Sequence, residues 1–85
     1  MDDQAMHNTI KVHRAIRNLT QAELAAVAGV TRKSVNAIET GRMVPSVLLA
    51  LKLARSLGVS VDTIFSLAAK PEVARLHSPI EELDV

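Results

Sequence analysis

Apolar and polar residues recur along residues 10–70 with the spacing of helices, and residue types that begin or end helices stand between the apolar segments. No segment carries a credible strand alternation. The pattern therefore predicts an all-α fold. Its five helices are expected at residues 10–16, 21–28, 32–40, 47–57 and from 61 to no later than 70.

Residues 20–40 carry the strongest local signals. Thr20 followed by Glu23 forms a capping box, and Gly29 is suited to ending the helix that it begins. Thr31 is a good N-cap for the next helix. Two short helices joined by a three-residue turn containing glycine are typical of a helix-turn-helix unit.

The helix that follows Thr31 has two different faces. Val35 and Ile38 form an apolar pair three residues apart. The other side carries long or polar side chains together with one small residue, namely Arg32, Lys33, Asn36 and Ala37. We expect this side to face outward.

The helix over residues 47–57 is apolar nearly all round, so we expect it to be the central helix of the core. Its solvent-facing side is indicated by Lys52, Arg55 and Ser56. Leu48 shares a face with Lys52 and Arg55, either as an ordinary exposed leucine or as part of an interface.

The net charge of +1 conceals an uneven distribution. Residues 1–9 carry Asp2 and Asp3, a net charge of −2. Residues 10–55 contain eight Lys and Arg residues against two acidic ones, a net charge of +6, whereas residues 56–85 contain two against five, a net charge of −3. A basic block with acidic ends is expected where one face of a protein meets phosphate.

Several classes of function have no support in the sequence. The absence of cysteine excludes disulfides and thiolate chemistry, and His7, His13 and His77 are too scattered to suggest a metal site. Neither a catalytic triad nor a glycine-rich phosphate loop is present, so we expect no enzyme, cofactor or small-molecule effector. Without an apolar leader or membrane span, we expect a cytoplasmic protein.

The sequence resembles the Cro and phage-repressor, or XRE, family of DNA-binding regulators over roughly residues 9–67, and most closely its short stand-alone members. The matching motifs span residues 20–25, 29–42, 45–46 and 57–65. The resemblance implies a five-helix lambda-repressor-like DNA-binding domain over residues 9–68, with residues 69–85 as a tail. Departures from the family pattern are His13, Asn18 and Leu48.

The resemblance also implies residue roles in binding double-stranded DNA. The residues expected to face base edges are Arg32, Lys33, Asn36 and Ala37. Those expected at the DNA backbone are Gln21, through its side chain and helix-end amide, and Thr31, Ser34, Thr40 and Arg42. Arg14 and Glu39 match a pair that forms an internal salt bridge in many members.

One such unit reads too few base pairs to select a site, so we expect a homodimer on a pseudo-palindromic operator. The apolar residues least needed for the five-helix core are expected at the interface, namely Val61, Phe65, Leu67, Val73 and Leu76, with Ile80 and Leu83. The alternative is an antitoxin or protein-interaction module whose tail binds a partner protein. A short helix after Ser78 and disorder before partner binding are both open for the tail.

Overall fold

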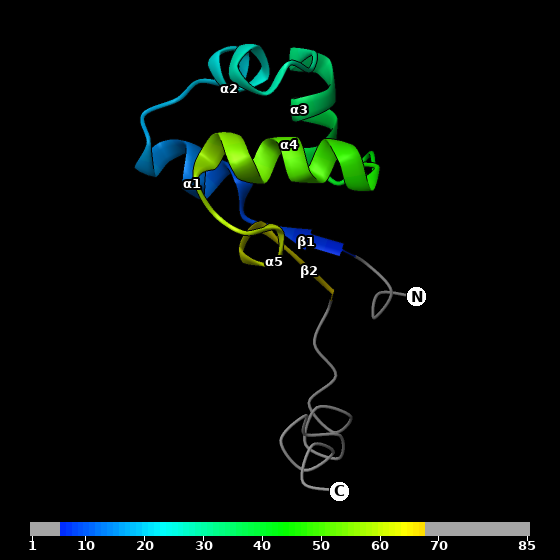
Figure 1. Cartoon of the computed structure of the whole chain (residues 1–85). Coiled ribbons are helices and arrows are strands. Elements are labelled where there is room, and N and C mark those ends of the chain that lie inside the picture. The colour runs from blue at the N-terminus through cyan, green and yellow to red at the C-terminus, as the bar shows by residue number, and fades with distance from the viewer. Residues whose placement is uncertain (1–5, 68–85) are drawn as a thin grey trace, which may run out of the picture.

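The computed structural model describes residues 6–67 (Figure 1). Within them, five short helices surround one apolar core, and the two ends of the described chain meet in a small sheet. The elements in chain order are β1 (Met6–Asn8), α1 (Ile10–Ile16), α2 (Gln21–Ala28), α3 (Arg32–Glu39), α4 (Val47–Leu57), α5 (Val61–Ile64) and β2 (Phe65–Leu67). The helical fold predicted from the sequence is confirmed, except for this sheet.

Local capping determines where the central helices begin. Thr20 accepts a hydrogen bond from the Glu23 backbone N–H while the Glu23 carboxylate accepts one from the Thr20 backbone N–H, which completes the predicted capping box. Thr31 accepts from the Ser34 N–H, and Ser46 caps α4 in the same way. These contacts satisfy N–H groups that have no partner inside the helix.

Left-handed residues end the helices where the sequence predicts. Asn18 follows α1 at φ 56°, and Gly29 follows α2 at φ 74°. A left-handed residue turns the chain sharply at a single position. α3 can therefore begin shortly after α2 ends, and the two helices pack against each other.

The sequence predicts no strand and a fifth helix that continues beyond residue 64, and both predictions are wrong. α5 ends at Ile64, and Phe65 is extended at φ −126° and ψ 136°. β2 pairs with β1 in antiparallel register, with the partners Met6↔Leu67, His7↔Ser66 and Asn8↔Phe65. Strands of three residues are too short to show an alternation in the sequence, and their pairing joins residues that lie 57 to 61 positions apart.

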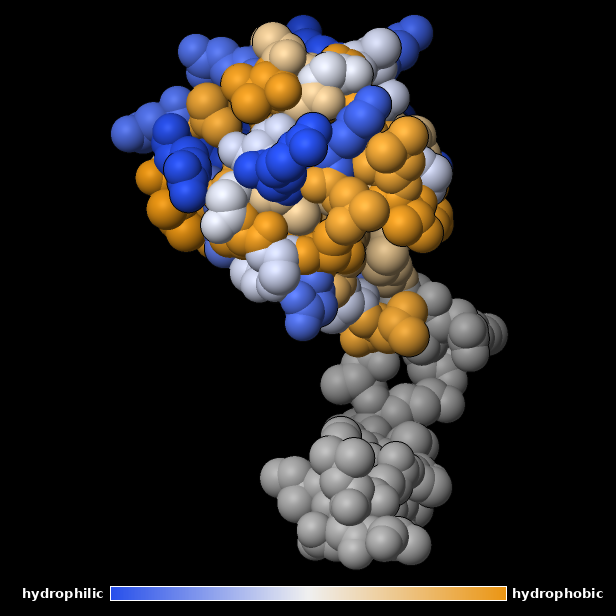
Figure 2. All heavy atoms as spheres, in the orientation of Figure 1, coloured by the Kyte–Doolittle hydropathy of each residue, from blue (hydrophilic) through white to orange (hydrophobic). Residues whose placement is uncertain are grey.

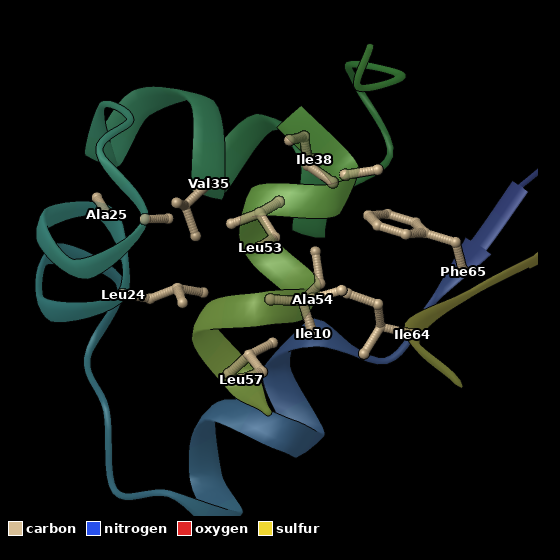
Figure 3. Packing of buried hydrophobic residues seen from close by; sticks show 12 residues of the cluster. Ile10, Leu24, Ala25, Val35, Ile38, Leu53, Ala54, Leu57, Ile64 and Phe65 are labelled. Atoms are coloured by element: carbon tan, nitrogen blue, oxygen red, sulfur yellow. The ribbon is translucent and has the colours of Figure 1, made fainter. Parts of the chain in front are cut away.

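The core lies around α4. Figure 3 shows side chains from α1, α2, α3, α5 and β2 converging on it. The prediction of a central helix holds for only one face of α4, which buries Ala50, Leu53, Ala54 and Leu57. Its other face carries three exposed apolar side chains, Val47, Leu48 and Leu51, beside the exposed Arg55.

Phe65 belongs to this core. It is only 8% exposed, so the expectation that it is among the residues the core requires least is wrong. The reason is that β2 turns the Phe65 side chain inward, while Leu67 at the strand end is 70% exposed and Val61 is half-buried. Val73 and Leu76, also expected at an interface, lie outside the described residues.

Asn8 connects the sheet to α3. Its Nδ2 donates to the backbone carbonyl of Ile38 at 3.0 Å, and its Oδ1 accepts from the Ile10 N–H at 3.3 Å. One side chain therefore fixes both the beginning of α1 and the last turn of α3.

No helix in the described part of the chain combines the length and apolar character needed to cross a membrane.

The burial of Ile10 provides a test of this core. Replacing Ile10 by Val should lower the free energy of unfolding by about 1 kcal/mol, because it removes a methyl group from a fully buried site. The same substitution at Ile16, which is 68% exposed on the same helix, should change it by less than about 0.5 kcal/mol. Urea unfolding followed by circular dichroism measures both, and equal losses would contradict this packing.

Candidate nucleic-acid interface

The outward side of α3 carries the residues that the sequence singles out. Arg32 and Lys33 are exposed, and Asn36 is half-buried at the seam with α2. Val35 and Ile38 on the opposite side are buried in the core. α3 is therefore anchored by its apolar side and presents cationic and amide groups to solvent.

Two adjoining hollows run along this face. One, of about 280 Å³, lies between α2 and α3 and is lined by Gln21, Arg32, Lys33 and Asn36. The other, of about 350 Å³, extends toward the loop after α3 and has seven lining residues, Thr31, Lys33, Ser34, Asn36, Ala37, Arg42 and Met43.

Lys33 and Asn36 line both hollows, so they lie at the centre of a continuous, open surface whose lining residues are mostly polar or charged. In Figure 2, several strongly hydrophilic residues lie, among apolar ones, at the end of the molecule where Figure 1 places α2 and α3. We call this area, made by the residues that line the two hollows, the α3 face.

The remaining residues expected at a DNA backbone lie around the rim of the α3 face. The Thr31 hydroxyl donates to Ser34 Oγ at 2.9 Å while it caps the helix. At the other end, the Thr40 hydroxyl donates to the Asn36 carbonyl at 2.8 Å and accepts from Arg42 Nε at 3.2 Å. Arg42 is thereby held beside the last turn of α3, with its guanidinium exposed.

Arg14 and Glu39, the expected internal pair, are in contact. Arg14 Nε lies 2.6 Å from Glu39 Oε2, and Arg14 Nη2 lies 3.1 Å from Glu39 Oε1. Arg14 Nη1 also donates to the Leu19 carbonyl at 2.9 Å. The Glu39 side chain is only 6% exposed, so this pair joins α1, the loop after it and α3 beneath the surface.

The pair alters the protonation equilibria of both residues. Burial alone would raise the pKa of Glu39, but hydrogen bonds from Arg14 and Gln21 and the charges of Arg14 and Lys11 outweigh it, so the pKa of this carboxyl lies below its usual range. The hydrogen bond to Glu39 raises the pKa of Arg14. Both groups are therefore charged at neutral pH.

The hydrogen bonds of the Gln21 side chain could not be predicted from the residues around it in the sequence. Its Nε2 donates to Glu39 Oε1 at 3.0 Å and to Asn36 Oδ1 at 3.1 Å. These partners lie 18 and 15 residues away, beyond any local pattern. Only the packing of α2 on α3 brings them together.

Comparison with known proteins gives consistent matches. The family model described as Helix-turn-helix matches residues 10–64. An uncharacterised HTH-type transcriptional regulator of Methanocaldococcus jannaschii is 47% identical over 60 residues, which cover 71% of this chain and 91% of that protein.

Two solved structures are also similar. The restriction-modification controller protein C.AhdI from Aeromonas hydrophila is 30% identical with a TM-score of 0.60, and the match covers 62% of this chain and 80% of that one. A chain of the SinR protein/SinI protein complex is 31% identical with a TM-score of 0.61, covering 87% and 69%.

The low pKa of Glu39 predicts a pH-dependent contribution to stability. A carboxyl whose pKa is lowered by folding stabilises the fold above its unfolded pKa, and this stabilisation is lost as the pH falls through its folded pKa. Glu39→Gln should therefore lower the free energy of unfolding by about 1–3 kcal/mol at pH 7. The difference in unfolding free energy between the variant and the unaltered chain should become smaller as the pH falls below about 4.5. Urea unfolding at a series of pH values measures this difference.

Glu23→Gln is a matched control, because glutamine also completes a capping box. It should change the unfolding free energy at pH 7 by less than about 0.5 kcal/mol. If Glu39→Gln lowered the unfolding free energy by the same amount from neutral to acid pH, the charge of the Glu39 carboxylate would not be the cause of the loss.

Proposed function

This chain belongs to the helix-turn-helix family of transcriptional regulators, and on that premise we propose that it binds double-stranded DNA through the α3 face, as a homodimer on a pseudo-palindromic operator. The observation that carries the proposal is an anchored helix that presents Arg32, Lys33 and Asn36 outward. A helix is narrow enough to enter the major groove, and these side chains can reach base edges.

Each residue of the face has a chemistry suited to one part of the groove. Arg32 or Lys33 would donate to guanine O6 and N7, and Asn36 would pair with adenine N6 and N7. The Ala37 methyl group would contact a thymine methyl group. Each good base contact contributes about 1–3 kcal/mol of discrimination.

The rim residues would contact phosphates and set the position of α3 in the groove. Thr31, Ser34 and Thr40 offer hydroxyls, and Arg42 offers an exposed cation. The backbone N–H groups at the first turn of α2, which begins at Gln21, carry partial positive charge suited to a phosphate oxygen.

An apolar surface on another side of the molecule supports the homodimer. A hollow of about 290 Å³ between α4, α5 and the sheet is lined almost entirely by apolar side chains, among them Leu51, Val61 and Phe65. Leu48 and Leu67 add exposed apolar area. Figure 2 shows hydrophobic residues gathered near the N-terminal half of α4. A second copy of the chain would cover this surface.

The alternative, an antitoxin or protein-interaction module, depends on the tail, which lies outside the described residues. Truncation at Ala69 distinguishes the two, since it should spare DNA binding by a regulator and abolish partner binding by an interaction module.

Substitutions at Arg32 and Arg42 test the division between base readers and backbone anchors. Duplexes selected from a random pool would supply the operator. Arg32→Ala should then relax the preference at one base pair by about 1–3 kcal/mol, because a base contact is lost. Arg42→Ala should weaken binding to all sequences alike and reduce the salt dependence, because a phosphate contact is lost.

Fluorescence anisotropy titrations against a panel of single-base-pair operator variants, at several salt concentrations, measure both effects. Identical behaviour of the two variants would contradict this division of roles. No binding of the unaltered chain to any duplex at low salt would overturn the proposed function.

Substitution of Leu51 tests the dimer. Leu51→Glu places a charge in the apolar hollow and should shift the chain from dimer to monomer in sedimentation velocity runs at tens of micromolar. Ile16→Glu, also at an exposed apolar position but outside the hollow, should leave the dimer intact. A monomeric unaltered chain under these conditions would rule out the homodimer.

A further inference from the structure

The amide of Gln21 lies between a carboxylate and a second amide. Its Nε2 is 3.0 Å from Glu39 Oε1 and 3.1 Å from Asn36 Oδ1. An ionised carboxylate only accepts hydrogen bonds, so the nitrogen end of the Gln21 amide must face Glu39. The same nitrogen faces Asn36, so Asn36 must turn its oxygen toward Gln21. The charge of Glu39 thus determines the orientation of both amides.

The two N–H groups of Gln21 are both used in these contacts. What its side chain has left to offer is the carbonyl oxygen, which only accepts. A phosphate oxygen also only accepts, so a hydrogen bond from this side chain to DNA backbone would require one internal bond to break. The geometry points to a different task for Gln21 than the phosphate contact that the family resemblance implies for its side chain.

Asn36 is the residue on which that task acts. It lines both hollows of the α3 face, whereas Gln21 lines only the one between α2 and α3. With its oxygen held by Gln21, its Nδ2 group and the second lone pair of Oδ1 are left for a ligand.

We propose that Gln21 is a positioning residue that fixes the amide of Asn36 in one of its two orientations for base reading. The inference rests on the proposed DNA-binding function. A bidentate contact to adenine needs an acceptor opposite N6–H and a donor opposite N7. An amide rotated by half a turn would set N–H against N–H, so a fixed amide discriminates between bases better than a free one.

The link to Glu39 makes this arrangement independent of DNA. Glu39 is held by two further hydrogen bonds from Arg14, so its carboxylate stays in place whether or not a duplex is bound. Asn36 is therefore oriented in the free protein, and binding requires no rearrangement of its amide.

A double-mutant cycle between Gln21 and Asn36 tests the proposal. Gln21→Met keeps the side-chain length and the helix propensity but removes both N–H donors. Binding would be measured on the selected operator and on operators altered at the base pair that Asn36→Ala relaxes. Gln21→Met should reduce the preference at that base pair by about ten-fold, and it should have no further effect on that preference in the Asn36→Ala background.

Arg32 provides the matched control for the cycle. It lines the same hollow as Gln21, yet it is not part of the amide network. The effects of Gln21→Met and Arg32→Ala should therefore add, and the preference at the base pair read by Arg32 should be unchanged by Gln21→Met.

The contrary result would be that Gln21→Met weakens binding to all sequences alike, and that this loss adds to the effect of Asn36→Ala. It would assign Gln21 to the phosphate backbone and overturn the positioning role while leaving the proposed DNA binding intact. If the unaltered chain binds no duplex, the proposed function fails and this role fails with it.

Nuclear magnetic resonance of the unaltered, free chain tests the network even if Gln21→Met does not fold. Both Nε2 protons of Gln21 should exchange with water more slowly than the side-chain amide protons of Asn18, which lies exposed in the loop after α1. Equal exchange rates would mean that the amide is not held and would overturn the inference.

Discussion

The position of α3 depends on how the buried carboxylate of Glu39 is satisfied. Three donors reach it, two from Arg14 on α1 and one from Gln21 at the start of α2. A buried pair of this kind need not contribute more stability than apolar side chains of the same volume. Its particular effect is geometric, because any arrangement of the three helices that separates the donors leaves a buried charge unpaired. The network therefore favours one arrangement of α1, α2 and α3.

A second constraint acts at the same end of α3. Asn8 donates to the carbonyl of Ile38, one residue before Glu39, and β1 is itself held by its pairing with β2. An isolated helix of eight residues is marginal in water, so α3 depends on such tertiary contacts for its stability. The sheet, although only three residues long in each strand, connects both ends of the described chain to the helix that presents the candidate interface.

The sequence predicts most of the helix boundaries because their signals are local. The capping residues contact groups only a few positions away in the sequence, so the sequence alone reveals them; they are Thr20, Glu23, Gly29 and Thr31. The family resemblance predicts the contact between Arg14 and Glu39, although 25 residues separate them in the sequence. The strand pair and the orientation of the Gln21 amide could not be predicted, because each depends on residues brought together only by the complete fold.

α4 separates the two proposed surfaces. Its buried side, where Ala50 and Ala54 allow close packing, supports α2 and α5, while Leu48 and Leu51 remain on its outer side. In the proposed dimer the contact between copies would lie on α4, α5 and the sheet, and the α3 face would stay free for the duplex. α2, which packs on both α3 and α4, connects the two surfaces through the core. The spacing between two α3 helices would then be set by packed side chains rather than by a flexible segment, as a fixed half-site separation requires.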